Sequence, residues 1–424
     1  MNLKLLIKHA RVIDTATGLD GIRDILIEND FISAINEEIN IKGMQVVEAD
    51  GLIAAPGLVD IHVHLRDPGQ TYKEDIISAC RAAAAGGITS LAAMPNTKPV
   101  ADSASVIEYI INKAKETGIR VYPIAAVTKG QEGLELNNFK LLAKAGAVAF
   151  SDDGRPVMSA AIMALAMGLA AAEGKTVISH CEDAALSQGG IVNEGIVSLK
   201  LKVKGLPAAA EEVQVAREAA LAVSLGLPIH IAHISTANSV ALIRDAKKRG
   251  AKITCETCPH YFSLDESLTL TRDADYRMNP PLRTKKDVAA IIEGLRDGTI
   301  DAIVTDHAPH TTQEKADFET APNGVVGLET SLAVGITYLV RPGYLTLNEL
   351  IEKMSISPAK IFKLNAGSLK EGALADIVLF NPDEKWRVVP DELKSKSHNT
   401  PFKNMELFGV VKHTICAGKI VYNA

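Results

Sequence analysis

Short apolar runs alternate with longer helical segments through the middle of the chain, between about residues 56 and 366. Eight runs have the length of a buried strand, and a segment with helical spacing of apolar residues follows each one. They span residues 58–65, 88–96, 120–128, 147–154, 176–183, 228–235, 252–260 and 302–310. Eight such βα units predict a parallel (β/α)8 TIM barrel over residues 56–366. The alternative, a doubly wound open sheet, needs a glycine-rich phosphate turn after the first strand, and the sequence has none there.

The two ends of the chain follow a different pattern, with short alternating runs separated by Gly, Asp and Asn. Residues 1–55 and residues 367–424 share this pattern, and neither segment is long enough to bury a core alone. We therefore expect them to pair into one small composite β-sandwich domain beside the barrel. The chain start is expected to form a strand, because it lacks the apolar core and cleavage site of a signal peptide.

Composition and charge are typical of a globular protein and exclude several other classes. Hydrophobic residues make up 47% of the 424 positions and charged residues 23%, which excludes disordered, collagen-like and coiled-coil chains. The formal net charge of −6 gives no polybasic surface for nucleic acid or for an anionic membrane. Five cysteines do not form a disulfide framework in a chain of this length, so we expect a cytoplasmic location. The apolar stretch 157–172 is too short to span a bilayer and is expected to be a buried helix.

Polar residues end the apolar runs repeatedly, and in a TIM barrel these carboxyl ends line the mouth of the active site. His62 and His64 lie two residues apart on the first run, so both imidazoles point to the same side. Four further runs end in Asp152, Asp153, His180, His233, Asp306 and His307. Histidine and carboxylate without clustered thiolates is the ligand set expected for zinc or a similar divalent ion. The set exceeds the needs of one ion, so we expect two metals bridged by a carboxylate and a hydroxide.

The remaining histidines and the cysteines are expected to be structural. His230 lies three residues before His233 and should face the opposite side of its strand. Cys181 should point away from the mouth for the same reason. Cys255 and Cys258 are expected to be core thiols, because a zinc knuckle would need a second pair. The other histidines interpreted as structural are His9, His260, His398 and His413.

Several motifs resemble the amidohydrolase superfamily and, within it, the long, class I dihydroorotases. The first barrel strand ends in HVHLRDPG (62–69), and the last leads into TDHAPH (305–310). The other matching motifs are MPNTKP (94–99), FSDDG (150–154), MNPPLR (278–283) and NGVVGLET (323–330). The resemblance covers essentially the whole chain, including the composite β-domain. It implies a hydrolase that interconverts dihydroorotate and N-carbamoyl-L-aspartate, a step of de novo pyrimidine synthesis.

The resemblance also implies the ligands of two Zn²⁺ ions in each subunit. These are His62, His64 and Asp306 for the first, more buried ion, and His180 and His233 for the second. Asp153 is the implied bridge, together with hydroxide, at a position where many relatives carry a carboxylated lysine. The absence of lysine from FSDDG agrees with class I dihydroorotases and argues against dihydropyrimidinases and hydantoinases. The neighbouring Asp152 stays open as an alternative bridge.

A catalytic residue and a set of substrate contacts follow from the same resemblance. Asp306 would take the proton of the attacking water and deliver it to the leaving amide nitrogen. Arg66 would grip the substrate carboxylate with its planar fork, with Asn96 beside it. The implied substrate-binding residues are His64, Arg66, Asn96, Asn279, His310, Gly324 and Val325. The structural alternative for Arg66 is a surface ion pair with Asp67 or Asp75.

Two other functions stay open from the sequence alone. Another cyclic-amide hydrolase, such as an allantoinase or a dihydropyrimidinase-like enzyme, would use the same barrel and metals, although Arg66 with Asn96 favours an acidic substrate. A non-catalytic dihydroorotase-like scaffold subunit would have lost metal ligands, and all of them are present here. The expected partners are a small-molecule substrate and a second copy of the chain in a homodimer, with association with aspartate transcarbamoylase left open.

Overall fold

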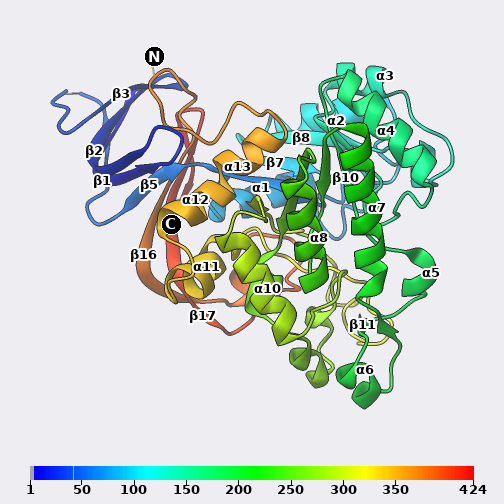
Figure 1. Ribbon diagram of the computed structural model, residues 1–424. Helices are drawn as coiled ribbons and strands as arrows, with labels where there is room; N and C mark the ends of the chain where they lie inside the picture. Colours follow the sequence, from blue (N-terminus) through cyan, green and yellow to red (C-terminus); the bar gives the residue numbers. More distant parts are fainter. Residues whose placement is uncertain (1–3, 42) are drawn as a thin grey trace.

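The computed structural model describes residues 4–41 and 43–424, and eight parallel strands form its centre (Figure 1). The strands pair with one another in chain order, from β6 to β15. They are β6 (Leu58–Val63), β7 (Ile88–Ala93), β8 (Arg120–Ala125), β9 (Ala149–Ser151), β10 (Val177–Ser179), β13 (Ile229–Ile231), β14 (Ile253–Thr257) and β15 (Ala302–Ile303). Each of the eight apolar runs contributes one strand, so the predicted TIM barrel is confirmed.

Contacts between the first strand and the segment after the last strand close the barrel. Asp60 on β6 accepts hydrogen bonds from the backbone N–H and the hydroxyl of Thr305, at 3.1 and 2.6 Å. A parallel bridge pairs Val63 with His307, and the N–H of His64 donates to the His307 carbonyl at 2.8 Å. The two ends of the strand series are therefore held side by side at the mouth of the barrel.

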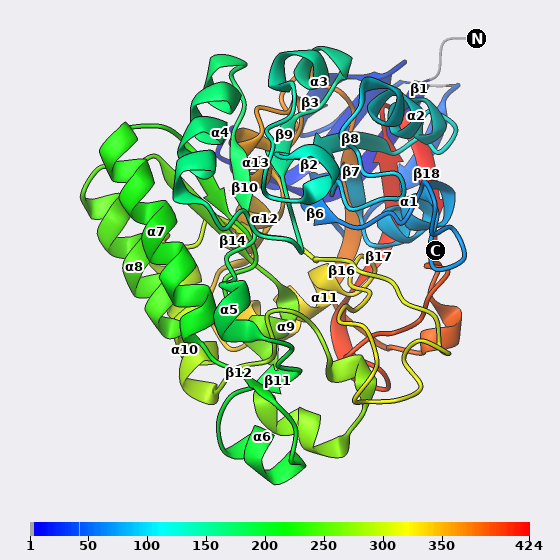
Figure 2. The same cartoon turned by 90° about the vertical axis from the view of Figure 1, so that its right-hand side faces the viewer.

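Helices cover the outside of the barrel between successive strands (Figure 2). Several start at a side-chain cap: the carboxylate of Asp75 accepts from the N–H of Ser78 at 2.8 Å at the start of α1. The main helices are α1 (Ile76–Ala85), α2 (Ala104–Ala114), α3 (Phe139–Ala145), α4 (Ala160–Ala172), α7 (Ala209–Leu225), α8 (Ala237–Lys248), α10 (Lys285–Arg296), α11 (Ser331–Gly335), α12 (Leu347–Met354) and α13 (Ile356–Ile361). Shorter elements lie in the loops that follow β10 and β14, namely α5 (Ala184–Ser187), β11 (Val192–Asn193), α6 (Ile196–Leu201), β12 (Gly205–Leu206) and α9 (Pro259–Ser263).

The apolar stretch 157–172 forms helix α4, which is buried on one face only. Met163 and Met167 are buried, whereas Leu165 is 61% exposed and Leu169 is 43% exposed. The prediction of a buried helix is therefore wrong for the outer face. The reason is that apolar residues surround this helix, so the sequence pattern does not distinguish a core-facing side from an outer side. Among the described helices, none is both long and apolar enough to cross a membrane.

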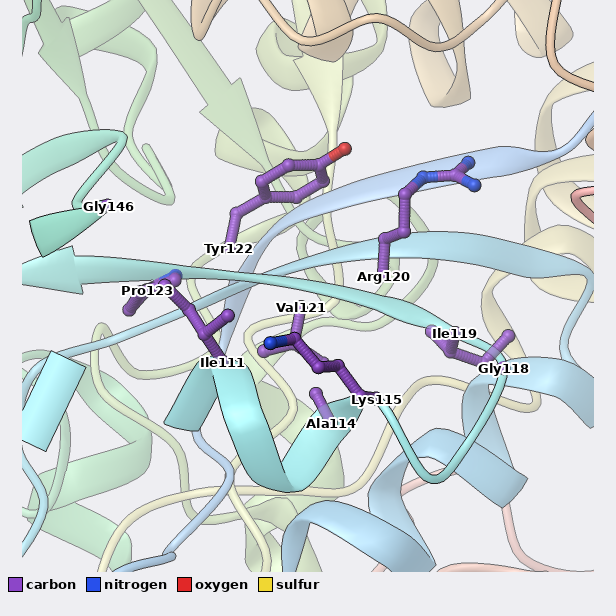
Figure 3. Close-up of a pocket in the computed structure, with 10 residues that line it drawn as sticks. All are labelled: Ile111, Ala114, Lys115, Gly118, Ile119, Arg120, Val121, Tyr122, Pro123 and Gly146. Atoms are coloured by element: carbon purple, nitrogen blue, oxygen red, sulfur yellow. The ribbon is translucent and has the colours of Figure 1, made fainter. Parts of the chain in front are cut away.

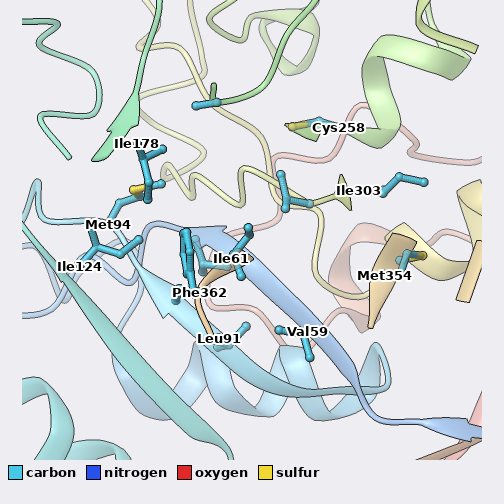
Figure 4. Close-up of a cluster of buried hydrophobic side chains, with 14 of the residues drawn as sticks. Val59, Ile61, Leu91, Met94, Ile124, Ile178, Cys258, Ile303, Met354 and Phe362 are labelled. Carbon is cyan, nitrogen blue, oxygen red and sulfur yellow. The ribbon is translucent and has the colours of Figure 1, made fainter. Parts of the chain in front are cut away.

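The hydrophobic core holds the barrel strands against the helices (Figure 4). Val59 and Ile61 of β6 belong to one buried cluster, which also contains Phe362 at the end of α13. The residues that alternate with them, Asp60 and His62, are also buried but form hydrogen bonds and ion pairs. Apolar packing thus fixes the strands, while the alternate positions carry the polar groups that lead to the site.

Strands from both chain ends form a separate sheet outside the barrel (Figure 1). The two ends pair as the sequence predicts, but they form one eight-stranded sheet, and the predicted β-sandwich stays a prediction. The sheet order is β18-β17-β16-β5-β1-β2-β3, with β4 paired to β1, and Ile53 of β5 lies opposite Phe380 of β16. Its strands are β1 (Lys4–Asp14), β2 (Leu19–Glu28), β3 (Phe31–Asn36), β4 (Gln45–Glu48), β5 (Ile53–Pro56), β16 (Ile377–Arg387), β17 (Glu406–Cys416) and β18 (Lys419–Asn423). The first three residues of the expected N-terminal strand lie outside the described residues. The domain boundaries near residues 55 and 367 stay a prediction.

Candidate active site

Two groups of buried side chains that could bind a metal ion meet at the carboxyl ends of the barrel strands, and they share Asp153. One group contains His62, His64 and Asp153, and the other contains Asp153, His180 and His233. Oδ1 of Asp153 lies 3.4 Å from Nε2 of His62 and 3.5 Å from Nδ1 of His180. Its Oδ2 lies 3.4 Å from Nε2 of His64. Histidines from three strand ends that are far apart in sequence therefore face one carboxylate.

Asp306 lies beside the first group. Its Oδ1 is 3.1 Å from Nε2 of His64 and 3.6 Å from Nε2 of His62. Burial raises the pKa of Asp306, but the hydrogen bond from His64 and the charge of His62 lower it more, to well below its usual range. Asp306 is therefore an ionised carboxylate beside the histidines, where the sequence analysis expected it.

Asp152 is turned away from the histidines, although it is the immediate neighbour of Asp153. Its Oδ1 accepts hydrogen bonds from the N–H groups of Val127 and Thr128, at 2.8 and 3.1 Å. The hydroxyl of Thr128 donates to Oδ2. Asp152 therefore ties β9 to the loop after β8, and Asp153 is the aspartate of this pair that faces both groups.

His62 and His64 each form a hydrogen bond from one ring nitrogen to a side-chain oxygen. Nδ1–H of His62 donates to Oε1 of Glu256 at 2.5 Å, and Nδ1–H of His64 donates to Oδ1 of Asn96 at 2.8 Å. In both rings the other nitrogen, Nε2, faces Asp153. This arrangement fixes the orientation of both rings and turns Nε2 of each toward the shared carboxylate.

His180 has the opposite orientation. Its Nδ1 lies 2.8 Å from Nε2 of His233, on the side of Asp153, and its Nε2 lies 3.1 Å from Oε2 of Glu182. Burial lowers the pKa of His180, but Asp153 and Glu182 raise it more, to about 10. The inward nitrogens of all four histidines therefore face the same point of the barrel mouth.

The side chains at this point fit a divalent metal cluster. Nε2 of His62 and Oδ1 of Asp153 are buried and have no hydrogen-bond partner in the described part of the chain. Buried polar atoms normally find a partner, and these two face each other without a hydrogen bond. Imidazole nitrogens with carboxylate oxygens are the donors that zinc-like ions prefer. The geometry thus agrees with a metal site that uses Asp153 in common.

The backbone has a left-handed φ at three residues around the site. The φ angles are 58° at Arg66, 29° at His233 and 47° at Asp306. Such angles are uncommon for residues other than glycine and are found most often where function requires them. Each of the three residues follows a strand end, so the sharp turn sets the direction of its side chain at the mouth of the barrel.

His230 faces the barrel interior, contrary to the prediction. Its Nε2–H donates to Oε2 of Glu256 at 3.0 Å, and the other oxygen of that carboxylate accepts from His62. The prediction failed because β13 ends at Ile231, so the alternation of a strand does not extend to His233. His230 is therefore linked to the site through Glu256.

A cavity of about 210 Å³ opens beside the histidines. It is lined by His64, Arg66, Asn96, Asp153, Gly154, His180, His233, Asn279, Asp306, Ala308, His310, Asn323 and Gly324. Gly324 has a φ of 138°, and a Cβ there would lie 2.6 Å from the carbonyl oxygen of Ala308, so glycine is required. Val325 is the expected substrate-binding residue that does not line the cavity, and its carbonyl accepts from the N–H of Ala308 at 2.8 Å.

Arg66 lines this cavity with a buried guanidinium, and its side chain has no carboxylate partner among the described residues. Nε–H donates to the carbonyl of Pro309 at 3.2 Å, and Nη2 lies 3.3 Å from Nε2 of His310. The alternative of a surface ion pair does not apply, because lysines pair with both Asp67 and Asp75. Arg66 therefore places a positive charge beside the two groups and close to Asp306 and Asp153, but no carboxylate among the described residues lies within ion-pair distance of it.

His310 is a neutral member of the cavity lining. Its Nδ1 accepts from Nζ of Lys73 at 3.2 Å, and its Nε2–H donates to the carbonyl of Asn323 at 2.9 Å. Burial lowers the pKa of His310, and the charges of Arg66 and Lys73 lower it further, to well below its usual range. His310 is therefore a neutral polar group of the cavity lining.

Sequence reasoning missed the acidic residues that hold the histidines. Glu256 lies within the apolar strand β14, and Glu182 lies two residues after His180. A carboxylate inside a buried strand was the available signal for Glu256. Its neighbours Cys255 and Cys258 are buried free thiols, as expected. Asn323, Ala308 and Gly154 were also not predicted to line the cavity.

A larger cavity of about 400 Å³ lies at the other end of the barrel (Figure 3). Ile111 and Lys115 from the end of α2 and Val121 of β8 lie along it. The described residues that line this cavity include no histidine and no carboxylate. It therefore lacks the imidazole and carboxylate ligands that a metal site of this kind needs.

Comparisons with known proteins agree with the chemistry of the site. A family model described as dihydro-orotase-like matches residues 51–239. A dihydroorotase from Acetivibrio thermocellus is 50% identical over 419 residues, which cover 98% of each chain. A dihydroorotase from Syntrophus aciditrophicus is 50% identical over 424 residues, which cover 99% of each chain. The chain belongs to the dihydroorotase family.

Solved structures place this dihydroorotase-family chain among the cyclic-amide hydrolases. An L-hydantoinase (dihydropyrimidinase) from Arthrobacter aurescens is similar with a TM-score of 0.89 at 25% identity, over 100% of this chain and 96% of that chain. A dihydropyrimidinase from Brevibacillus agri has a TM-score of 0.82 at 23% identity and shows the fold alone. The barrel with its terminal sheet is thus the architecture of enzymes that hydrolyse cyclic amides.

Proposed function

We propose that this chain is a dihydroorotase that interconverts L-dihydroorotate and N-carbamoyl-L-aspartate in de novo pyrimidine synthesis. The observation that carries the proposal is the buried guanidinium of Arg66 in the same cavity as the two groups of metal-binding residues. Dihydroorotate has a carboxylate fixed on its ring, and an unpaired guanidinium is suited to bind such a group through two parallel hydrogen bonds. Membership of the dihydroorotase family supports the same substrate.

Two Zn²⁺ ions in each subunit are part of the proposal. His62, His64 and Asp306 would hold the first ion, His180 and His233 the second, and Asp153 would bridge them. When bound, such ions lower the pKa of water to roughly 7 and polarise the amide carbonyl. The unpartnered Nε2 of His62 and Oδ1 of Asp153 support a metal at this point, and the absence of a thiolate from the two groups favours zinc bound by nitrogen and oxygen.

Asp306 is the proposed carrier of the proton. In hydrolysis the ring C–N bond breaks, the water oxygen joins the carbonyl carbon, and the nitrogen must gain a proton. Asp306 is ionised and lines the cavity, so its carboxylate would accept the proton of the attacking water and deliver it to the leaving nitrogen. Ring closure uses the same steps in reverse.

The remaining lining residues would orient the ring. Asn96 uses its Oδ1 to accept from His64, which leaves its Nδ2 free for the substrate. Asn279 uses its Nδ2 to donate to Glu182, which leaves its Oδ1 free. The backbone of Gly324, which has no side chain, and the neutral ring of His310 complete the proposed substrate contacts.

Turnover assays combined with metal analysis test this function. We expect hydrolysis of L-dihydroorotate, cyclisation of N-carbamoyl-L-aspartate, and about two zinc ions per chain. Faster turnover of allantoin or dihydrouracil than of dihydroorotate would assign the chain to another cyclic-amide hydrolase. No turnover of any cyclic amide by metal-loaded protein would favour a scaffold subunit.

The homodimer, the association with aspartate transcarbamoylase and the cytoplasmic location stay predictions. Size-exclusion chromatography with and without the transcarbamoylase tests the first two.

A further inference from the structure

Glu182 connects a metal-binding histidine to a residue of the substrate cavity. Its Oε2 lies 3.1 Å from Nε2 of His180 and accepts from Nδ2 of Asn279 at 2.6 Å. His180 belongs to the second group of metal-binding residues, and Asn279 lines the cavity, whereas Glu182 does not. One carboxylate oxygen therefore contacts both a histidine of the second group and an asparagine of the cavity lining.

The contact with His180 determines which ring nitrogen can bind a metal. An ionised carboxylate only accepts hydrogen bonds, so Nε2 of His180 must carry the proton that it donates to Glu182. Nδ1, on the side of Asp153 and His233, is then the nitrogen that would give up its proton and bind a metal. Without Glu182 the ring would lose both its tautomer preference and its orientation.

The contact with Asn279 determines which end of the amide faces the substrate. Because Nδ2 donates to Glu182, Oδ1 is turned toward the other side of the amide group. An acceptor at this position suits an N–H group of a cyclic amide. Loss of Glu182 would allow the amide to rotate and present a donor instead.

Besides His180 and Asn279, the carboxylate of Glu182 has one further side-chain hydrogen-bond contact, with Ser187 at the end of α5. Asp183, and not Glu182, caps α5 by accepting from the N–H groups of Ala185 and Leu186. In the described part of the chain, the carboxylate of Glu182 has no lysine or arginine within ion-pair distance, and its ion-pair partner is His180. The side chain is 19% exposed, so the residues around it cover most of its surface.

We propose that Glu182 is a positioning residue that couples the second metal subsite to substrate binding, by holding His180 and Asn279 through one carboxylate oxygen. This inference rests on the proposed dihydroorotase function for its substrate half. Its metal half depends only on the residues described above.

The experiment compares zinc-loaded wild type with Glu182→Ala, Glu182→Gln, Asn279→Ala and the double variant Glu182→Ala/Asn279→Ala. Zinc release is measured during stepwise addition of a chelator, and KM and kcat are measured with dihydroorotate. Glu182→Ala should release the second zinc at a chelator concentration at least ~10-fold lower than wild type, with the first zinc unchanged. It should also raise KM at least ~5-fold. Glu182→Gln keeps an acceptor oxygen and should fall between Glu182→Ala and wild type.

The double variant tests the coupling itself. Asn279→Ala should raise KM but release zinc like wild type, because Glu182 still holds His180. The double variant should have a KM within about 2-fold of the worse single variant, since both changes break one contact. Glu194→Ala, an exposed glutamate in the following loop, is the matched control and should match wild type.

Zinc release or a KM that stays at the wild-type value in Glu182→Ala would overturn the proposal. So would a double variant whose rise in KM equals the product of the rises in the two single variants. Circular dichroism and thermal melting identify a variant that fails to fold, in which case Glu182→Gln decides the outcome. If wild type does not turn over dihydroorotate, the proposed function fails. Zinc release then still tests whether Glu182 positions His180.

Discussion

Nδ1–H of His62 donates to Oε1 of Glu256 across 2.5 Å, and both side chains are completely buried. The second oxygen of Glu256 accepts from Nε2–H of His230 at 3.0 Å. This carboxylate therefore links a metal-binding histidine of the first barrel strand to a histidine of a distant strand. Burial raises the pKa of Glu256, but the charges of His62 and His230 lower it more, to about 2, so the carboxylate is ionised.

Removing the charge of Glu256 should weaken the first metal subsite. Glu256→Gln can accept through only one atom, so the orientation of His62 would be less well fixed. We expect the first zinc to be released at a chelator concentration about 10-fold lower than in wild type, because such supporting contacts are worth 10–100-fold in metal affinity. Glu293→Gln, on the surface of α10, is the matched control. Equal zinc release in both variants would mean that Glu256 has a structural role alone.

Metal removal should abolish activity, and single histidine changes should separate the two subsites. Chelation of both ions should reduce turnover to background, and added Zn²⁺ should restore it. His180→Ala should leave about one zinc per chain, because it removes a ligand of the second group without altering the first. Elemental analysis alongside the assay measures both effects. Full turnover by metal-free protein would rule out the proposed mechanism.

Asp306→Asn should separate proton transfer from metal binding. Asparagine has a similar shape and keeps an oxygen toward His64, but it cannot accept and return a proton. We expect kcat to fall by at least ~10², measured with dihydroorotate at matched zinc content. Near-normal turnover would transfer the role to another group.

Glu329 should make stability depend on pH away from the active site. Its carboxylate accepts from the N–H groups of Lys394 and Ser395, yet burial raises its pKa from 4.5 to about 7. Between these pH values the folded chain binds more protons than the unfolded chain, so stability falls as pH rises through this window. Glu329→Gln cannot ionise, and its melting temperature should fall less between pH 5 and 8, by at least ~2 °C. Parallel melting curves for the two proteins would contradict this assignment.

The sequence predicted correctly those features that depend on one strand alone, such as its presence and the side on which its residues lie. Eight apolar runs predicted eight barrel strands, and the spacing of His62 and His64 placed both on one side because strand alternation holds within β6. The glycine at position 324 was also expected at the cavity, and its φ of 138° gives the reason.

Prediction failed for the side of the strand that His230 faces and for the carboxylates that hold the histidines from other strands. The side of β13 that His230 faces could not be derived, because His233 lies beyond the strand end with a φ of 29°. The roles of Glu182 and Glu256 depend on contacts across the barrel, over 97 residues for Glu182 with Asn279 and 194 for Glu256 with His62. No local pattern encodes such pairs. The choice between Asp152 and Asp153 required the same spatial information.

Substrate choice should depend on Arg66. Dihydroorotate differs from dihydrouracil chiefly by its ring carboxylate, so discrimination requires a group that binds this anion. The guanidinium of Arg66 is buried in the cavity, and no carboxylate among the described residues lies within ion-pair distance of it. A charge-assisted contact is worth roughly 1.5–3 kcal/mol, or about one to two orders of magnitude in transition-state binding.

Arg66→Ala should therefore lower kcat/KM for dihydroorotate by at least ~10-fold while zinc content stays unchanged. Arg66→Lys should restore activity only in part, because an ammonium group cannot form the planar fork. Arg81→Ala, an exposed arginine on α1, serves as the control and should behave like wild type. Wild type should barely hydrolyse dihydrouracil, since the buried guanidinium would face an uncharged ring. Comparable wild-type rates on the two substrates would mean that Arg66 does not select the carboxylate and that the chain is a different cyclic-amide hydrolase.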